Sequence, residues 1–229
     1  MAWQGLENEY ARVTARALTL LDQVPQGFRS VSLTTHFPAN NTLAGQLKAV
    51  ATLIGARSAL AVKRQVFLVS LGGFDHHAGL MNDQPGLLTR VSEAITAFYA
   101  ATVELGVADK VTLFTASDFG RSFTMNGSGS DHGWGSHHFA VGGAVSGAAF
   151  YGTPPPLSVT DTAAADDQWH VGQGRLLPTT SVEQYAATLA SWFGVSSSEL
   201  RDVLPNIRNF GGSLGGVSYP VDLGFIRRK

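Results

Sequence analysis

The sequence of 229 residues contains no cysteine. Disulfide bonds and thiolate metal sites are therefore excluded, and a bound metal ion must be held by imidazole and carboxylate groups. The absence of cysteine does not identify a cell compartment, because many exported proteins also avoid this residue.

Charged residues are also scarce, at 14% of the chain, and the formal net charge is −1. Without a basic excess there is no electrostatic basis for binding the phosphate backbone of a nucleic acid. Hydrophobic residues make up 44% of the chain, which is too many for a disordered protein. Length and composition therefore predict a single globular domain over residues 1–229 with a real core.

Long apolar runs are missing as well. No stretch reaches the roughly 20 apolar residues that cross a bilayer, so we expect no transmembrane segment. The first ten residues are polar and acidic, without the basic and apolar regions of a signal peptide. Taken by itself, the sequence predicts a cytoplasmic protein if the chain is complete.

Amphipathic helices are predicted where apolar residues recur at helical spacing. The four stretches are residues 5–23, 42–61, 84–105 and 181–193. Pro25 is expected to end the first helix, and Thr42 to cap the second. Ser181 and Gly194 are the expected N-cap and stop of the fourth.

Two short, continuous apolar runs, residues 65–71 and 110–116, are typical of buried strands. The helix predicted between them completes a βαβ crossover. The sequence therefore predicts an α/β fold in which helices flank a mostly parallel sheet, with residues 139–147 as a further candidate strand. Its parts are a helical lead-in over residues 1–62, the sheet and site loops over residues 63–210, and an irregular tail over residues 211–229.

Polar, ligand-type side chains follow both predicted strands. Asp75 and Asp118 come after residues 65–71 and 110–116, and ligands bind at the carboxyl ends of strands in open parallel sheets. Aspartate is also a common turn or cap residue. Position alone gives equal weight to a role in ligand binding and a role in a turn. Residues 126–138 are rich in Gly, Ser, Asp and His, and this composition predicts a loop. A loop with so many ligand-type side chains favours a functional role.

Imidazole and carboxylate groups gather in these loops, which favours a site for a divalent cation such as Zn, Mn, Mg or Ca. The candidate ligands are Asp75, His77, Asp118, Asp131, His132, His137 and His138. Such an ion would hold an anionic substrate oxygen, act as a Lewis acid and lower the pKa of bound water toward about 7. His76 is expected to point away, and His36 and His170 to be structural or surface residues.

Arg121 and Ser213 each allow two interpretations. The guanidinium of Arg121 could clamp a phosphate or sulfate through paired hydrogen bonds, or it could pair with a nearby Asp. Ser213 lies in a Gly-x-Ser-x-Gly string, which matches the nucleophile elbow of serine hydrolases. No apolar strand precedes this string and no helix is predicted after it, so a serine esterase is the weaker hypothesis.

Several motifs together resemble one family, the domain-of-unknown-function family 1501, found mostly in bacteria. They are Phe37-Pro38, Leu43-Ala44, Gln65 to Leu71, Gly-Gly-Phe-Asp-His-His (72–77), Ser-Asp-Phe-Gly-Arg (117–121), Asn-Gly-Ser-Gly-Ser-Asp-His-Gly-Trp-Gly (126–135), Tyr151-Gly152 and Trp192-Phe193-Gly194. The string at residues 126–135 is long enough to be specific. The resemblance covers most of the chain, from about residue 36 to residue 210.

Members of this family look like remote relatives of the alkaline phosphatase superfamily, so the resemblance implies part of an alkaline phosphatase-like domain. Asp75 and His77 resemble the Asp and His that follow one strand in the superfamily. Asp118 resembles the Asp of a later Asp-His pair, but Phe119 stands where its His would be.

The resemblance leaves the missing imidazole to be supplied by His132 together with His137 or His138. This departure puts the two-metal geometry of the superfamily in doubt. The substrate that the resemblance implies is a small anionic ester.

The resemblance also implies export to the periplasm or beyond. Family members usually begin with an export signal, often of twin-arginine type, and a strand with a Gly-Gly-Asn-Asp-like turn. Superfamily enzymes carry a nucleophilic Ser or Thr after that strand. This sequence shows neither the export signal nor the strand with its turn and nucleophile, and it resembles an N-terminally truncated member. The leading hypothesis is a metal-dependent hydrolase of phosphate or sulfate esters, and the alternative is a non-catalytic exported protein for binding or assembly.

Overall fold

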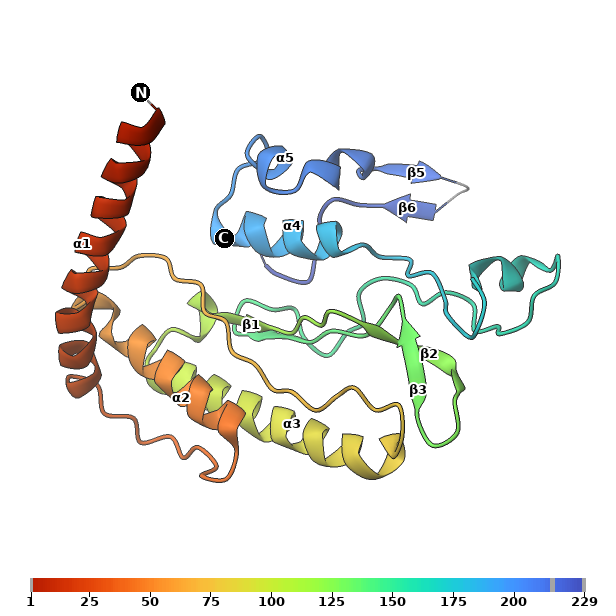
Figure 1. Ribbon diagram of the computed structural model, residues 1–229, viewed down its shortest axis with the longest axis horizontal. Coiled ribbons are helices and arrows are strands. Elements are labelled where there is room, and N and C mark those ends of the chain that lie inside the picture. The colour runs from red at the N-terminus through yellow and green to blue at the C-terminus, as the bar shows by residue number, and fades with distance from the viewer. Residues whose placement is uncertain (1, 215–216, 228–229) are drawn as a thin grey trace. The chain divides into compact units, whose positions relative to one another are not determined.

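The computed structural model describes residues 2–214 and 217–227 (Figure 1). The chain divides into two compact units, one within residues 1–71 and 90–107 and the other within residues 72–89 and 108–229. The long helix α3 (Leu80–Glu104) contributes its first turns to the second unit and the rest to the first. Among the described helices, none is both long and apolar enough to cross a membrane.

The first unit is helical. Its elements are α1 (Ala2–Arg29), α2 (Thr42–Gly55), the 3₁₀ turn η1 (Ala56–Ser58) and the later part of α3. Asn41 caps α2, because its side-chain oxygen accepts a 3.2 Å hydrogen bond from the Ala44 N–H. The same amide donates a 2.8 Å hydrogen bond to the Arg90 carbonyl oxygen, which ties the start of α2 to α3.

The buried apolar side chains of α2 and α3 lie on one stripe of each helix, at the three- and four-residue spacing of an amphipathic helix. They are Leu43, Ala44, Leu47, Val50, Ala51 and Ile54 on α2, and Ala94, Ala97, Phe98 and Ala101 on α3. Gly27 of α1 allows a close approach here, since a Cβ at that position would lie 3.0 Å from the Cβ of Ala56.

The helix ends differ from the predicted ones. Pro25 does not end the first helix, because α1 continues to Arg29. Pro85 likewise lies inside α3, which begins at Leu80. Proline removes one intrahelical hydrogen bond, and near the end of a long helix this loss does not stop the helix. The expected cap at Thr42 is also corrected, since Asn41 caps α2 and Thr42 is its first residue.

The predicted α/β fold with a mostly parallel, alkaline phosphatase-like sheet is wrong. The described strands form three separate two-stranded sheets, and all three are antiparallel. They pair β1 (Thr112–Phe114) with β4 (Ala140–Gly142), β2 (Gly120–Met125) with β3 (Ser130–Gly133), and β5 (Gly212–Leu214) with β6 (Val217–Tyr219). Residues 65–71 belong to none of these sheets, so the part of the chain that the structure describes contains no βαβ crossover. Apolar periodicity predicts extended backbone, but it does not identify the partner of a strand.

The second unit is organised around α4 (Val182–Phe193), which confirms the predicted helix over residues 181–193. Ser181 caps it in a reciprocal capping box with Gln184, and Gly194 ends it in the left-handed region at φ 105°. One side of α4 packs on a cluster around Phe225 and Ile226. The other packs on a cluster that includes residues of α5 (Leu200–Val203) and the 3₁₀ turn η4 (Pro205–Asn209). The turns η2 (Ala108–Lys110) and η3 (Ala165–Trp169) complete this unit.

Candidate metal centre

The loop of residues 72–77 lies against the β2–β3 hairpin in the second unit. The Ser130 N–H donates a 3.3 Å hydrogen bond to the His76 carbonyl oxygen, and the Leu80 N–H donates a 3.0 Å bond to the Ser128 carbonyl oxygen. Gly129 makes the approach possible, because a Cβ there would lie 2.4 Å from the His77 carbonyl carbon and 2.5 Å from the His76 oxygen. Main-chain contacts therefore fix the loop on the hairpin.

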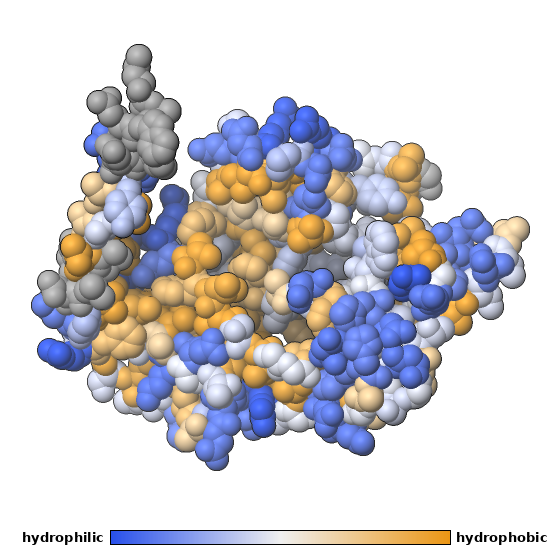
Figure 2. Space-filling model, viewed as in Figure 1, coloured by the Kyte–Doolittle hydropathy of each residue, from blue (hydrophilic) through white to orange (hydrophobic). Residues whose placement is uncertain are grey.

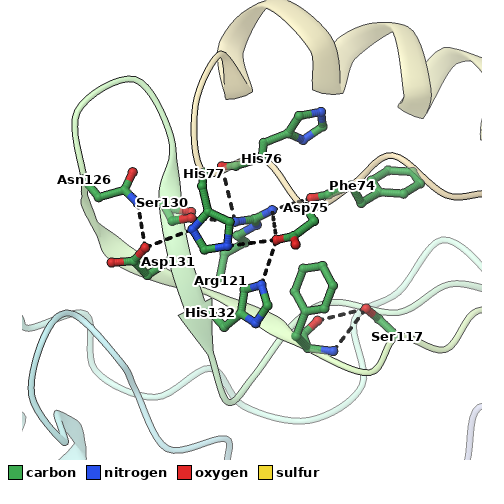
Figure 3. A network of polar contacts seen from close by, with 11 residues as sticks. Phe74, Asp75, His76, His77, Ser117, Arg121, Asn126, Ser130, Asp131 and His132 are labelled. Atoms are coloured by element: carbon green, nitrogen blue, oxygen red, sulfur yellow. Dashed lines mark hydrogen bonds and ion pairs between the residues drawn. The ribbon is translucent and has the colours of Figure 1, made fainter.

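Arg121 of β2 holds the same loop with its guanidinium group (Figure 3). Its Nη1 donates to the carbonyl oxygens of Ser130 at 2.5 Å and His76 at 3.3 Å, and its Nη2 donates to that of Phe74. The side chain is only 21% exposed, and Nη2 lies 3.6 Å from Asp75 Oδ1. Arg121 thus binds main chain from both segments, beside a carboxylate.

Asp75 is the centre of a polar group formed with two imidazoles. His132 Nε2 lies 2.7 Å from Asp75 Oδ1, and His77 Nε2 lies 3.1 Å from the same oxygen. The hydrogen bond from His132 holds the pKa of Asp75 below its ordinary value, with further contributions from the charges of His77, His132 and Arg121. Asp75 is therefore favoured as a carboxylate.

Asp75, His77 and His132 each offer one ligand atom, and these three atoms lie within 4.8 Å of one another. Their side chains are 58%, 51% and 47% exposed. In the described part of the chain, this is the group of histidines and carboxylates whose geometry suits a metal ion. Half-exposed side chains leave room for solvent or a ligand on the outer side of the group.

A second layer of contacts orients the two imidazoles. Asp131 Oδ1 lies 3.1 Å from His77 Nδ1, and Asn126 Nδ2 donates a 2.6 Å hydrogen bond to that same oxygen. The ring of Phe119 stacks on His132, with centroids 4.2 Å apart and planes 7° from parallel. Each imidazole therefore has one nitrogen toward Asp75, while carboxylate or aromatic contacts fix the ring.

The structure brings together some of the predicted site residues and leaves others apart. Asp75, His77 and His132 form the group, and Asp131 reaches it through His77. Asp118, His137 and His138 are not members of it. Asp118 is exposed in the turn between β1 and β2, where the side chain of Ser117 accepts a hydrogen bond from the Phe119 N–H and donates one to its carbonyl oxygen.

His138 belongs to a different cluster. Its Nδ1 lies 3.3 Å from the Thr115 hydroxyl, its Nε2 lies 3.2 Å from the Ser136 hydroxyl, and its ring stacks on Tyr185. Burial lowers the pKa of His138, and the charge of His137 lowers it further. Burial also raises the pKa of Tyr185 to about 12. Both groups are thus held neutral near pH 7.

The ring of His76 points away from the group, as expected for the residue between two ligands (Figure 3). It is buried, and its Nδ1 has no hydrogen-bond partner among the described residues. Two residues that contact the candidate metal ligands, Asn126 and Phe119, were not predicted as part of the site. Asn126 carried no signal beyond its place in a polar loop, and Phe119 stood out only as a departure from the resembled pattern.

Ser213 lies inside β5, within an exposed hairpin. A nucleophile elbow places its serine at a sharp turn between a strand and a helix. The position of Ser213 in the middle of a strand is not that geometry.

Comparison with known proteins identifies a family. A family model described as a protein of unknown function (DUF1501) matches residues 8–204. No curated protein and no solved structure matches the chain. The match covers most of the sequence, and the chain belongs to this family.

Proposed function

We propose that this DUF1501 member is a metal-dependent hydrolase of phosphate or sulfate esters, with Asp75, His77 and His132 as ligands of one divalent cation. The observation that carries the proposal is the convergence of three ligand atoms within 4.8 Å. They come from two segments that are far apart in sequence and are fixed to each other by main-chain hydrogen bonds and by the side chain of Arg121.

The two separations from Asp75 Oδ1 are close to those around a metal ion. Ligands at about 2.1 Å from a tetrahedral ion lie about 3.4 Å from one another. The present separations from Asp75 Oδ1 are 2.7 Å to His132 and 3.1 Å to His77. Widening these two separations by about 0.7 and 0.3 Å, within the reach of exposed side chains, would give the spacing from Asp75 that an ion requires.

The donor set narrows the choice of metal. Two imidazole nitrogens and one carboxylate oxygen suit Zn²⁺ or Mn²⁺, whereas Mg²⁺ and Ca²⁺ prefer oxygen ligands. Zn²⁺ sites with three protein ligands keep a fourth position for water or substrate, and this is the pattern of catalytic sites. The proposed cofactor is therefore Zn²⁺ or Mn²⁺.

The chain's own residues prepare the site for this chemistry. With its proton on Nδ1 toward Asp131, His77 would offer the lone pair of Nε2 to the ion. Asp75 is kept as a carboxylate by its neighbours. When bound, the metal would supply Lewis acidity toward an anionic ester oxygen and lower the pKa of a coordinated water toward about 7.

A second function is favoured by the position of Arg121. Its guanidinium lies 3.6 Å from Asp75 Oδ1, and its hydrogen-bonding groups already bind main-chain carbonyls, so they are not free to hold the anionic group of a substrate. A non-catalytic protein for binding or assembly would keep the same polar group without turnover. The two functions differ in whether ester hydrolysis accompanies metal binding.

The first test is metal content. The purified chain is stripped with a chelator, titrated with Zn²⁺ or Mn²⁺ by calorimetry, and compared with His132→Ala and with His36→Ala as the matched control. His36 is an exposed histidine outside the group. We expect about one ion per chain in wild type and in His36→Ala, and loss of most of the affinity in His132→Ala. If the wild-type chain binds neither ion, the site assignment is wrong.

The second test separates hydrolysis from binding alone. The metal-loaded chain is assayed with p-nitrophenyl phosphate and p-nitrophenyl sulfate, and Asp75→Asn is the inactive reference. Turnover that disappears in Asp75→Asn and persists in His36→Ala supports the hydrolase. Stoichiometric metal binding without turnover of either ester supports the non-catalytic function instead.

We also propose export to the periplasm or beyond, on the basis of the family resemblance alone. The test is fractionation of cells that express the native gene, with an antibody against the chain. Recovery in the cytoplasmic fraction would overturn this location.

A further inference from the structure

Residues 170–175 form a tight turn against β2 within the second unit. The Phe123 N–H donates a 2.7 Å hydrogen bond to the Gly174 carbonyl oxygen, and the Thr124 hydroxyl donates a 2.7 Å bond to that of Gln173. Gly174 has no room for a side chain, because a Cβ there would lie 2.4 Å from the Thr124 nitrogen. The turn is therefore bound to two consecutive residues of β2.

The backbone of this turn has an unusual conformation. Gly172, Gln173 and Gly174 follow one another with φ values of 88°, 57° and 71°, all in the left-handed region. Glycine adopts this region readily, but a residue with a side chain, such as Gln173, is strained there. A strained turn of this kind persists only when the contacts around it hold it in place.

The imidazole of His170 supplies one of these contacts. The Gly174 N–H donates a 2.8 Å hydrogen bond to His170 Nε2, and His170 Nδ1 lies 3.0 Å from the Thr160 carbonyl oxygen. A main-chain N–H can only donate, and a carbonyl oxygen can only accept. Nε2 is therefore the nitrogen without a proton and Nδ1 carries one, so the closed turn requires the neutral imidazole.

Protonation of Nε2 removes the acceptor that the Gly174 N–H needs. Both nitrogens of a charged imidazole are donors, so two donors would face each other across 2.8 Å. Histidine ordinarily gains its second proton between pH 5 and pH 8. His170 is only half-buried, and Figure 2 shows a mostly hydrophilic surface where Figure 1 draws β2 and β3. Solvent protons therefore reach this contact.

The charged groups near His170 have other partners or are exposed. Those on the surrounding segments and on β2 are Asp161, Asp166, Asp167, Arg175 and Arg121. Asp167 accepts hydrogen bonds from three hydroxyl groups within residues 158–162, and Arg175 donates to the Gly172 carbonyl oxygen. Arg121 binds the main chain beside the candidate metal ligands, and Asp161 and Asp166 are exposed. Among the described residues, none forms an ion pair with His170.

We propose that His170 is an acid-sensitive latch, which holds the turn of residues 170–175 on β2 and releases it when the imidazole is protonated. In the open state the strained backbone of Gln173 relaxes, and Phe123 loses its main-chain partner. Because β2 pairs with β3, which carries His132, the latch acts on the hairpin of the candidate metal centre. It requires no bound metal, so it stands or falls separately from the proposed hydrolase.

Amide hydrogen exchange of the purified chain measures how often the turn opens. Closure weakens as the pH falls, because the open turn binds a proton that the closed turn excludes. For a histidine that titrates near pH 6.5 when the turn is open, the open fraction rises about thirtyfold between pH 8 and pH 5. The amides of Gly174 and Phe123 should show this rise after correction for the intrinsic pH dependence of exchange. Amides within α4 should not.

His170→Gln is the informative variant, because a carboxamide oxygen can accept from the Gly174 N–H at every pH. We expect this variant to keep the amides of Gly174 and Phe123 equally protected at pH 8 and pH 5. His170→Ala has no acceptor and should be open at both pH values. His36→Gln replaces an exposed histidine outside the turn and should behave like wild type. Circular dichroism checks that each variant keeps its fold.

The wild-type chain also gives a direct measurement of the latch. The nitrogen chemical shifts of His170 should show a neutral ring protonated on Nδ1 at pH 8. A ring protonated on Nε2 would overturn the proposal, because it could not accept from Gly174. The latch is also refuted if Gly174 is as well protected at pH 5 as at pH 8, or if acid opens His170→Gln as much as it opens wild type.

Discussion

Replacement of Arg121 by alanine distinguishes a structural role from the substrate-clamping role that its place in the sequence predicted. The guanidinium donates to the carbonyl oxygens of Phe74, His76 and Ser130. These oxygens belong to the two segments that carry the metal ligands. If the structural role is correct, the substitution releases residues 72–77 from the β2–β3 hairpin.

The magnitude follows from the number and kind of these bonds. A hydrogen bond from a charged donor contributes about 1.5–3 kcal/mol, and Arg121 makes three with its side chain mostly buried. The released carbonyl groups regain water in the open loop, which offsets part of the loss. We therefore expect Arg121→Ala to lower the free energy of unfolding by about 3 kcal/mol. Arg121→Lys should cost about half as much, because a single ammonium group cannot reach all three oxygens.

The assay combines urea unfolding with hydrogen exchange. Urea unfolding gives the loss of stability, and exchange shows whether opening is local to residues 72–77 and 121–133. Hydrolysis kinetics supply the contrast, since a substrate clamp would raise KM without reducing stability. The reasoning is refuted if Arg121→Ala changes stability by less than about 1 kcal/mol and its only effect is a higher KM for the ester.

Three further predictions follow from other contacts. Asn126→Ala should weaken metal affinity about tenfold in calorimetry, because Asp131 loses the donor that orients it; an unchanged affinity would show that Asp131 needs no support. His76→Leu should raise the free energy of unfolding in urea by about 1 kcal/mol, since the buried Nδ1 has no partner among the described residues, and a clear destabilisation would contradict this. Hydrogen bonds from Thr34 and Thr35 lower the pKa of Glu104 from 4.5 to about 2. The Glu104 carboxylate therefore stabilises the fold above pH 4.5, and this contribution is lost as the pH falls toward 2. Thr35→Val should be less stable than wild type at pH 6 and equally stable near pH 2. A stability difference that persists at low pH would be evidence against a role of this carboxylate.

Local signals in the sequence predict local structure well. The helix over residues 181–193 is bounded by Ser181, Gln184 and Gly194, and every contact that caps it lies within a few residues. The sheet depends on partners that are distant in sequence. The run at residues 65–71 has the composition of a buried strand, yet it has no neighbouring strand among the described residues. Its extended backbone was predictable, and its pairing was not.

In the candidate site too, contacts within one turn were predictable and contacts between distant segments were not. Asp75 and His77 were predictable as a pair, because one turn holds both. Asp118 was chosen because parallel strands would bring its turn beside that of Asp75, and the antiparallel pairing of β1 with β4 removes this reason. Asn126 follows β2 and reaches Asp131 of β3 across a hairpin whose register shifts between Arg121 and Met125, and simple alternation along a strand does not predict a contact of that kind.

The contacts that hold the proposed metal ligands lie within the second unit, where Arg121 and Gly129 join residues 72–77 to the hairpin. Leu68 is an exposed residue of the first unit and has no role in those contacts. We therefore expect Leu68→Lys to keep the wild-type affinity for Zn²⁺ in calorimetry, and Arg121→Ala to lose most of it. If Leu68→Lys also weakens Zn²⁺ binding, the hairpin is not sufficient to fix the site.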